Sequence, residues 1–148
     1  MRKPTIQLSL AISGREEEAK RDAAAMQAKL EAAGYRVYNP FELVDDIEPK
    51  NLEEHVYWWA CTVRCCDNII EHKPDAIVSY FRGYKDSHGM RIEDDVAQRA
   101  GYQNIYPFGP PGIHTGILMK LGNASLPQSC IAELEKILRP FDAEGSNA

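Results

Sequence analysis

Short apolar segments alternate along this chain with longer segments in which apolar residues recur every three or four positions. The short segments have the length and composition of strands, and the longer ones have the period of amphipathic helices. The expected strands are residues 5–12, 35–38, 75–81 and 104–108, and the expected helices are residues 16–33, 52–72, 92–101 and 127–138. This order predicts an α/β fold, a flavodoxin-like (Rossmann-like) doubly wound parallel sheet of four to five strands with helices on both faces.

Two segments of this pattern need separate comment, one without an assigned element and one helix with a long apolar face. The segment Gly109-Pro110-Pro111-Gly112 breaks the chain, and residues 113–125 after it are not assigned to an element. The helix expected at 52–72 has one face that is apolar over most of its length. That face contains Val56, Trp59, Val63, Cys66 and Ile70.

Composition limits the class of protein. The chain has 148 residues, 44% of them hydrophobic and 26% charged, which is enough to bury the core of one globular domain. We expect that domain at residues 1–140 and a flexible tail at 141–148. The net charge of −5 disfavours a nucleic-acid polymer as partner, because such binding depends on lysine and arginine. No apolar segment is long enough to span a bilayer and no signal peptide is evident, so we expect a cytoplasmic protein without a membrane segment.

The four cysteines do not form a disulfide or zinc motif. Cys61, Cys65 and Cys66 lie in one expected helix and Cys130 is far from them in sequence. This spacing suits neither a disulfide framework nor a paired C-x-x-C zinc site. We therefore expect reduced thiols and no metal site.

The fold predicts where a ligand would bind. Open parallel sheets bind ligands at the carboxyl ends of their strands, where the strand order reverses. In this chain that point falls between the first and third strands, so the loops at 13–15 and 82–89 should face one crevice.

The segment after the third strand combines a potential anion site with a carboxylate. Ser87 can cap the following helix, and Gly89 allows close approach to the backbone amides at its start. Glu93 lies on the flank of the apolar stripe, whereas Asp94 falls on the expected outer face. Partial burial would make Glu93 a reactive carboxylate, but a glutamate here also simply complements the helix dipole. Both interpretations stay open at this point.

Two further charged residues have a functional and an ordinary interpretation. Arg15 follows Ser13-Gly14 in the first turn, where a guanidinium could clamp a phosphate or remain solvated. Asp67 lies at the edge of an apolar helical stripe, with Arg64 near enough in sequence to be a surface partner.

Taken together, these residues resemble the nucleoside 2-deoxyribosyltransferase superfamily, which includes nucleoside 5′-monophosphate N-glycosidases. The resemblance covers most of residues 5–108. In chain order its pieces are Ile12-Ser13-Gly14-Arg15, Ala32-Ala33-Gly34-Tyr35, Tyr38-Asn39-Pro40, Asp67 eight residues before Asp75-Ala76-Ile77-Val78, Ser87-x-Gly89-x-x-x-Glu93, Val96-Ala97 and Gly101.

The resemblance implies a role for each matched residue. Glu93 corresponds to the nucleophile that attacks the anomeric carbon, and Asp67 to the aspartate that assists at the base or sugar. Ser87 stands where monophosphate hydrolases have a serine for the 5′-phosphate and where transferases tend to have aspartate. The other residues that the resemblance places around the phosphate are Ser13, Gly14, Arg15 and Gly89.

The activity implied is hydrolysis of the N-glycosidic bond of nucleoside 5′-monophosphates, releasing free base and sugar phosphate without a metal or organic cofactor. Such bonds break through an oxocarbenium-like state that a carboxylate stabilises or captures. The implied partner is a small-molecule nucleotide or nucleoside, and the implied assembly is a homodimer or higher homo-oligomer. Base exchange between free deoxynucleosides and a non-catalytic nucleotide-binding sensor or regulatory module remain alternatives. The sequence does not specify the base, the sugar or the roles of His88, Arg91, Trp58 and Trp59.

Overall fold

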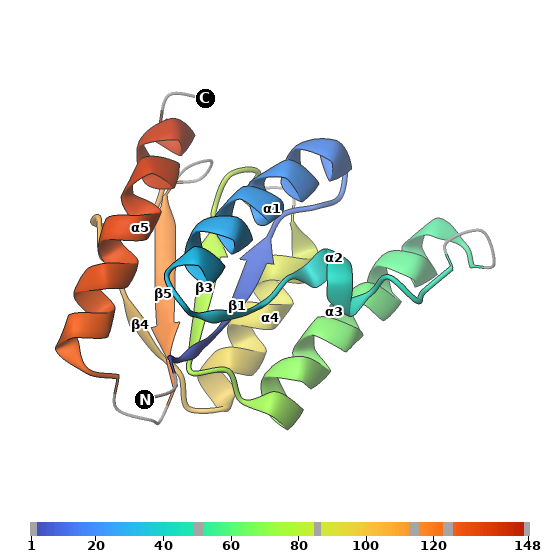
Figure 1. Cartoon of the computed structure of the whole chain (residues 1–148). Coiled ribbons are helices and arrows are strands. Elements are labelled where there is room, and N and C mark those ends of the chain that lie inside the picture. The colour runs from blue at the N-terminus through green and yellow to red at the C-terminus, as the bar shows by residue number, and fades with distance from the viewer. Residues whose placement is uncertain (1–2, 49–51, 85–86, 113–115, 123–125, 147–148) are drawn as a thin grey trace.

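A five-stranded sheet in the order β2-β1-β3-β5-β4 forms the centre of the molecule (Figure 1). The structure is a computed structural model that describes residues 3–48, 52–84, 87–112, 116–122 and 126–146. The strands are β1 (Thr5–Leu10), β2 (Arg36–Tyr38), β3 (Ala76–Tyr80), β4 (Gln103–Ile105) and β5 (Ile117–Leu121). The helices are α1 (Glu16–Ala32), α2 (Pro40–Leu43), α3 (Glu54–His72), α4 (His88–Arg99) and α5 (Gln128–Ser146).

The sheet is parallel in its centre and mixed at one side. β1 pairs in parallel with β2 and β3, whereas β5 is antiparallel to both β3 and β4. The predicted α/β, flavodoxin-like class is confirmed, and the antiparallel β5 is its main departure from a fully parallel sheet. The sequence left this strand unassigned. A parallel return from β4 needs a crossover of a dozen or more residues, usually a helix, and the Gly- and Pro-rich connection from β4 to β5 contains no described helix.

Helices cover both faces of the sheet. On one face, α1 and α5 pack on alternate strand residues (Figure 1). This larger core is apolar and includes Ile6, Leu8, Leu10, Met26, Leu30, Val78, Tyr80, Met119, Leu134 and Leu138. On the other face, α3 and α4 pack through a smaller cluster of Ile69, Ile77, Ala97 and Tyr102.

The sheet face toward α3 and α4 also carries buried polar side chains. Gln7, Ser9, Ser79 and Lys120 are each at most 1% exposed. Gln7 donates from Nε2 to the Cys65 carbonyl oxygen at 3.1 Å and accepts from Asn68 Nδ2 at 2.6 Å. A buried polar group is costly unless it finds a partner, so a row of them on a sheet face requires local compensation.

Helix α3 buries a different face from the one that the sequence marks as apolar. Its buried residues are Cys61, Cys65, Cys66, Asn68 and Ile69. Of the predicted apolar face, only Cys66 is buried, and the other four are exposed. Their exposed fractions are 39% for Val56, 58% for Trp59, 51% for Val63 and 55% for Ile70.

Helix α5 extends further than expected. The sequence places the end of this helix at Leu138 and a tail from residue 141, but α5 continues to Ser146 with Pro140 inside it. Phe141 is 5% exposed and belongs to the larger core. Burial of this ring favours continuation of the helix across a proline that would otherwise end it.

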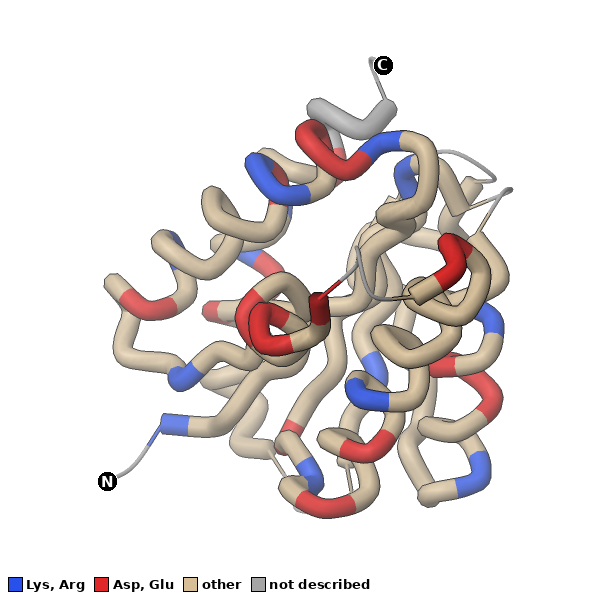
Figure 2. Tube along the Cα trace, turned by 90° about the vertical axis from the view of Figure 1, so that its right-hand side faces the viewer, with Lys and Arg blue, Asp and Glu red and all other residues tan. Residues whose placement is uncertain are grey.

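Charged residues are dispersed along the described trace, with Lys and Arg interspersed among Asp and Glu (Figure 2). Within the part of the chain that the structure describes, no helix combines the length and apolar character needed to cross a bilayer.

Candidate active site

A cavity of about 800 Å³ lies beyond the carboxyl end of β1 and beside the start of α4. A cavity of this size lies within the range of small-ligand sites. The residues that follow β1, the first turns of α1 and α4, helix α2 and the first half of α3 form its walls. The lining residues are Leu10, Ile12, Ser13, Glu16, Glu17, Lys20, Pro40, Phe41, Val44, His55, Tyr57, Trp58, Trp59, Cys61, Thr62, Cys65, Ser87, His88, Gly89, Ile92 and Glu93.

Glu93 is the buried carboxylate of this cavity. It shares the buried face of α4 with Met90 and Ala97, and only 8% of the residue is exposed. Its Oε1 atom has no hydrogen-bond partner among the described residues. Burial raises the pKa of Glu93 from 4.5 to about 8, and Asp94 adds to this effect, whereas Lys120 and Ser9 oppose it. The cavity therefore holds a carboxyl group that takes up and releases its proton near neutral pH.

The start of α4 forms the wall next to Glu93. Ser87 is the N-cap residue, and its Oγ accepts a hydrogen bond from the Met90 amide at 3.2 Å, as the sequence predicts. A Cβ atom at Gly89 would lie 3.2 Å from Thr62 Oγ1, so the absence of a side chain lets α4 approach α3 closely. Ser87, His88 and Gly89 all line the cavity, which places a helix N-terminus at its edge.

Aromatic side chains also line the cavity. Phe41 comes from α2, and Tyr57 and Trp58 come from the first turn of α3. The Tyr57 and Trp58 rings meet edge to face with centroids 4.9 Å apart. The sequence left the role of Trp58 open and assigned Phe41 to no expected helix or strand. Asn39-Pro40 was the available signal, because Asn39 caps α2 by accepting from the Phe41 amide and proline is favoured at the first helical position.

The cavity rim carries charges of both signs. Glu16, Glu17 and Lys20 come from α1, while His55 and His88 come from α3 and α4. The structure thus offers the Lys20 ammonium as a cationic group for an anionic ligand, and two imidazole rings as hydrogen-bonding groups.

Of residues 13–15, which were expected to surround a phosphate, only Ser13 lines the cavity. Ser13 lines the cavity together with Ser87 and Gly89, so the two expected loops do face one crevice. Gly14 is outside the lining residues, and it forms the turn before α1 with a φ of +79° that glycine adopts without strain.

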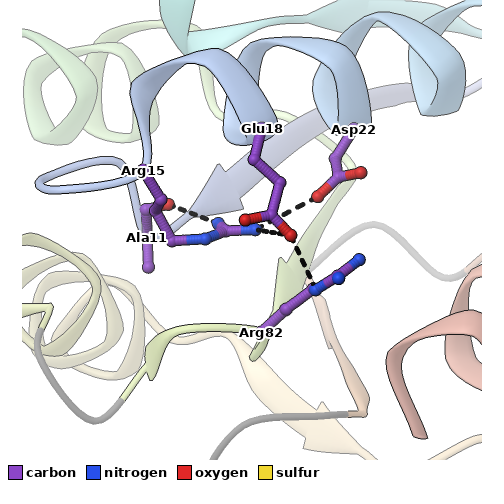
Figure 3. A network of polar contacts seen from close by, with 5 residues as sticks. All are labelled: Ala11, Arg15, Glu18, Asp22 and Arg82. Atoms are coloured by element: carbon purple, nitrogen blue, oxygen red, sulfur yellow. Dashed lines mark hydrogen bonds and ion pairs between the residues drawn. The ribbon is translucent and has the colours of Figure 1, made fainter. Parts of the chain in front are cut away.

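Arg15 is not among the residues that line the cavity, contrary to the expected phosphate clamp. Its guanidinium donates to the Ala11 carbonyl oxygen at 2.6 Å and pairs with Asp22 at 3.2 Å and Glu18 at 3.4 Å (Figure 3). Glu18 also pairs with Arg82 at 2.9 Å, so the Arg15 side chain belongs to a local ionic network. The two acidic partners lie on one face of α1 and draw the guanidinium away from the cavity.

Asp67 lies outside the cavity as well, so the structure does not bring it together with Glu93. It is exposed on α3 and borders a second, shallow depression, which includes Val63 and Arg64 and shares only Trp59 with the lining of the cavity. The cavity contacts α3 through Cys61 and Cys65, and a residue two positions after Cys65 points to the opposite side of a helix. The helical phase of α3 therefore removes Asp67 from the predicted pair of carboxylates.

The described residues contain no group of three or more histidine, cysteine or acidic side chains arranged to hold a metal ion. All four cysteines are free thiols. Burial raises the pKa of Cys65, and it raises that of Cys66 to about 12, with the Glu93 charge acting in the same direction. These thiols are therefore poor nucleophiles at neutral pH.

Fold and site together define an α/β protein with a ligand-sized cavity at the carboxyl edge of its sheet and a buried glutamate in that cavity. The chain belongs to the family DUF4406, a domain of unknown function, which matches residues 4–106. The match includes β1 to β4 and every residue that lines the cavity. Comparison with curated proteins and with solved structures gave no match.

Proposed function

We propose that this protein hydrolyses the N-glycosidic bond of nucleoside 5′-monophosphates with Glu93 as the nucleophile. The observation that carries the proposal is a glutamate that is buried, without a partner for Oε1, and at the wall of a cavity of about 800 Å³. The resemblance to the nucleoside 2-deoxyribosyltransferase superfamily supplies the reaction class, and the cavity supplies a fitting place for it.

The reaction needs an ionised carboxylate. Glu93 would attack C1′ of the sugar, the C1′–N bond would break, and the bond electrons would leave with the base. Water would then hydrolyse the glycosyl ester, which releases the sugar phosphate and regenerates the carboxylate. Since Asp67 is exposed on another side of α3, a proton for the departing base would come from solvent or from a cavity group such as Glu16, His55 or His88.

The substrate would be held at three places. The phosphate would meet the first turn of α4, where backbone amides lack intrahelical partners and the Ser87 hydroxyl is nearby. Lys20 would supply positive charge that Arg15 does not, and the two rim histidines would offer ring N–H groups as hydrogen-bond donors. The base would stack on Phe41, Tyr57 or Trp58, which give the cavity its aromatic wall.

The test is release of free base from a panel of purine and pyrimidine nucleoside 5′-monophosphates, in ribo and deoxyribo form, followed by chromatography. Glu93→Ala should abolish release, whereas Asp67→Asn should retain it, because the Asp67 side chain lies outside the cavity. Addition of a second free base separates hydrolysis from base exchange, since a transferase would form a new nucleoside or nucleotide. Absence of base release from every nucleotide would refute the proposal.

One observation favours a non-catalytic alternative. The cavity lacks the Asp67 carboxylate that the resemblance pairs with the nucleophile, and a site with one carboxylate is also suited to binding alone. A nucleotide sensor would bind a nucleotide tightly without turnover, and Glu93→Gln would leave its affinity unchanged. Isothermal titration calorimetry with the same nucleotide panel distinguishes this function from hydrolysis.

The resemblance also implies a homo-oligomer, and we propose the exposed face of α3 as the surface that it uses. Val56, Trp59, Val63 and Ile70 are each at least 39% exposed and follow one another at helical spacing. Contiguous exposed apolar surface of this kind is typical of protein interfaces.

A further inference from the structure

Lys120 is a buried cation on the sheet face toward α4. Only 1% of the residue is exposed, and it comes from β5 at the position opposite Ile77 of β3. Its Nζ forms an ion pair with Asp94 of α4 and donates to Ser79 Oγ at 2.9 Å. Burial of a charged pair often costs more stability than it returns, so these contacts do not by themselves explain why a lysine occupies this position.

The polar contacts of Lys120 lead toward Glu93. Ser79 of β3 lies opposite Ser9 of β1 in the parallel register, and Lys120, which is opposite Ile77, reaches diagonally to Ser79, so the three polar side chains lie on one face of three adjacent strands. Among the described residues, Ser9 Oγ and Glu93 Oε1 are the buried side-chain atoms without a partner in full hydrogen-bond geometry, yet Ser9 lies close enough to Glu93 to lower the pKa of its carboxyl. Asp94, which holds Lys120, directly follows Glu93 in α4.

We propose that Lys120 is a positioning residue for Glu93, because its buried Nζ, held by Asp94 and Ser79, supplies the positive charge that favours the ionised carboxylate in the cavity. This inference rests on the proposed function and deepens it. In that function Glu93 must be an anion before it can attack the sugar, although its surroundings favour the protonated form.

The groups that face Glu93 from neighbouring elements act in opposite directions. Asp94 on α4 raises the pKa of Glu93, whereas Lys120 on β5 and, after it, the Ser9 hydroxyl on β1 lower it. Burial lowers the pKa of Lys120 itself, and the adjacent Asp94 carboxylate opposes that shift and so favours the charged ammonium. On α3, Cys65 and Cys66 lie near enough for Glu93 to raise the pKa of both thiols, so they remain neutral and add no positive charge. Without the Lys120 charge, Glu93 would face Asp94 with no described cation to oppose it.

The experiment measures the Glu93 carboxyl directly. Protein labelled with ¹³C at the glutamate side-chain carboxyl is titrated by NMR, and Glu93→Gln identifies the resonance. Lys120→Met and Lys120→Gln should each raise the midpoint of Glu93 by about one pH unit, which is roughly a tenfold loss of ionised carboxylate below the midpoint. Lys120→Gln can still hydrogen bond to Ser79 and Asp94, so it removes the charge with less disturbance of the packing.

Two controls separate charge from packing. Lys136→Gln removes an exposed lysine of α5 and should leave the midpoint unchanged, and Lys120→Arg should retain the wild-type midpoint if it folds. In wild-type protein, the ¹⁵Nζ resonance of Lys120 should shift at the midpoint of Glu93, and this inflection should be absent from Glu93→Gln. The wild-type measurement requires no Lys120 variant to fold.

An unchanged Glu93 midpoint in both neutral variants, or a Lys120 resonance that does not respond to Glu93, would overturn the proposal and leave Lys120 with a packing role only. The titration does not depend on turnover, so it stands even if no nucleotide is hydrolysed. If base release is found, the acidic limb of its pH profile should move upward in Lys120→Gln by the same amount as the NMR midpoint.

Discussion

Glu93→Gln should make the protein more stable at high pH. The folded carboxyl keeps its proton up to about pH 8, whereas in the unfolded chain it ionises near pH 4.5. Between these values the folded state binds more protons than the unfolded state, so wild-type stability falls as the pH rises through this window. Glutamine has nearly the size of protonated glutamate and has no charge to release.

The structure sets a limit on the size of this effect. Each pH unit between 4.5 and about 8 lowers the free energy of unfolding of the wild-type protein by about 1.4 kcal/mol. The complete window therefore corresponds to at most about 5 kcal/mol. The carboxyl borders a cavity that opens to solvent, and relaxation and hydration reduce such costs. We therefore expect the free energy of unfolding of Glu93→Gln, taken relative to that of the wild type, to increase by about 1–3 kcal/mol when the pH is raised from 5 to 9.

Urea unfolding at pH 5 and pH 9 measures this gain. The quantity of interest is the change with pH in the difference between the free energies of unfolding of variant and wild type, because other titrating groups cancel in it. Glu71→Gln, which replaces an exposed glutamate of α3, is the matched control and should show no pH-dependent difference. The reasoning is refuted if Glu93→Gln shows the same difference at both pH values or loses stability at pH 9.

Four further predictions test the site. If Glu93 acts as a carboxylate, kcat/KM for base release should rise about tenfold per pH unit below pH 8 and then level off, in a pH profile from 5 to 10. Ser87→Ala should lower stability by about 1 kcal/mol through loss of the cap, and should raise KM for monophosphates more than for nucleosides in steady-state assays. Arg15→Ala should lower Tm in calorimetry through loss of its ionic network, yet leave KM unchanged. Trp59→Glu should convert an oligomer to the monomer in sedimentation velocity, whereas an unchanged mass would exclude this face as the interface.

Hydrophobic period and turn chemistry predicted the parts of the site that lie close together in sequence. The cap at Ser87 was predicted, and the period placed Glu93 on the flank of the apolar stripe without deciding whether it is buried. Gly89 was expected to let an anion approach the helix start, whereas the structure shows that it also lets α4 approach Thr62 of α3. The meeting of Ser13 with this segment followed from strand order alone, because β1 and β3 are adjacent and parallel.

The prediction for Asp67 failed because α3 has apolar residues on two faces. Cys61, Cys65 and Ile69 are buried, while Val56, Trp59 and Val63 are exposed with the same spacing. Hydrophobicity alone therefore could not determine the rotation of this helix, which decides where Asp67 points. For Arg15 a signal was present, since Glu18 and Asp22 follow at helical spacings of three and seven, on the face where they pair with its guanidinium.

The ion pair of Asp94 could not be predicted from the sequence for a different reason. Its neighbours in sequence place it on the outer face of α4, but it pairs with Lys120 from a strand that the sequence left unassigned. No local pattern reveals an ion pair between a helix and an antiparallel strand that follows it, because the contact depends on the direction of β5.

The two faces of the sheet differ in a way that bears on function. The face toward α1 and α5 carries the larger apolar core, and its burial supplies a favourable contribution to stability. The opposite face buries Ser9, Ser79 and Lys120 beside a cavity and a glutamate with an unpartnered oxygen. A core built only for stability would place apolar residues at these positions, since each buried polar group is costly. Gln7 on this face has structural partners in Cys65 and Asn68 of α3, whereas Ser9, Ser79 and Lys120 are the residues that the proposed role of Glu93 would account for.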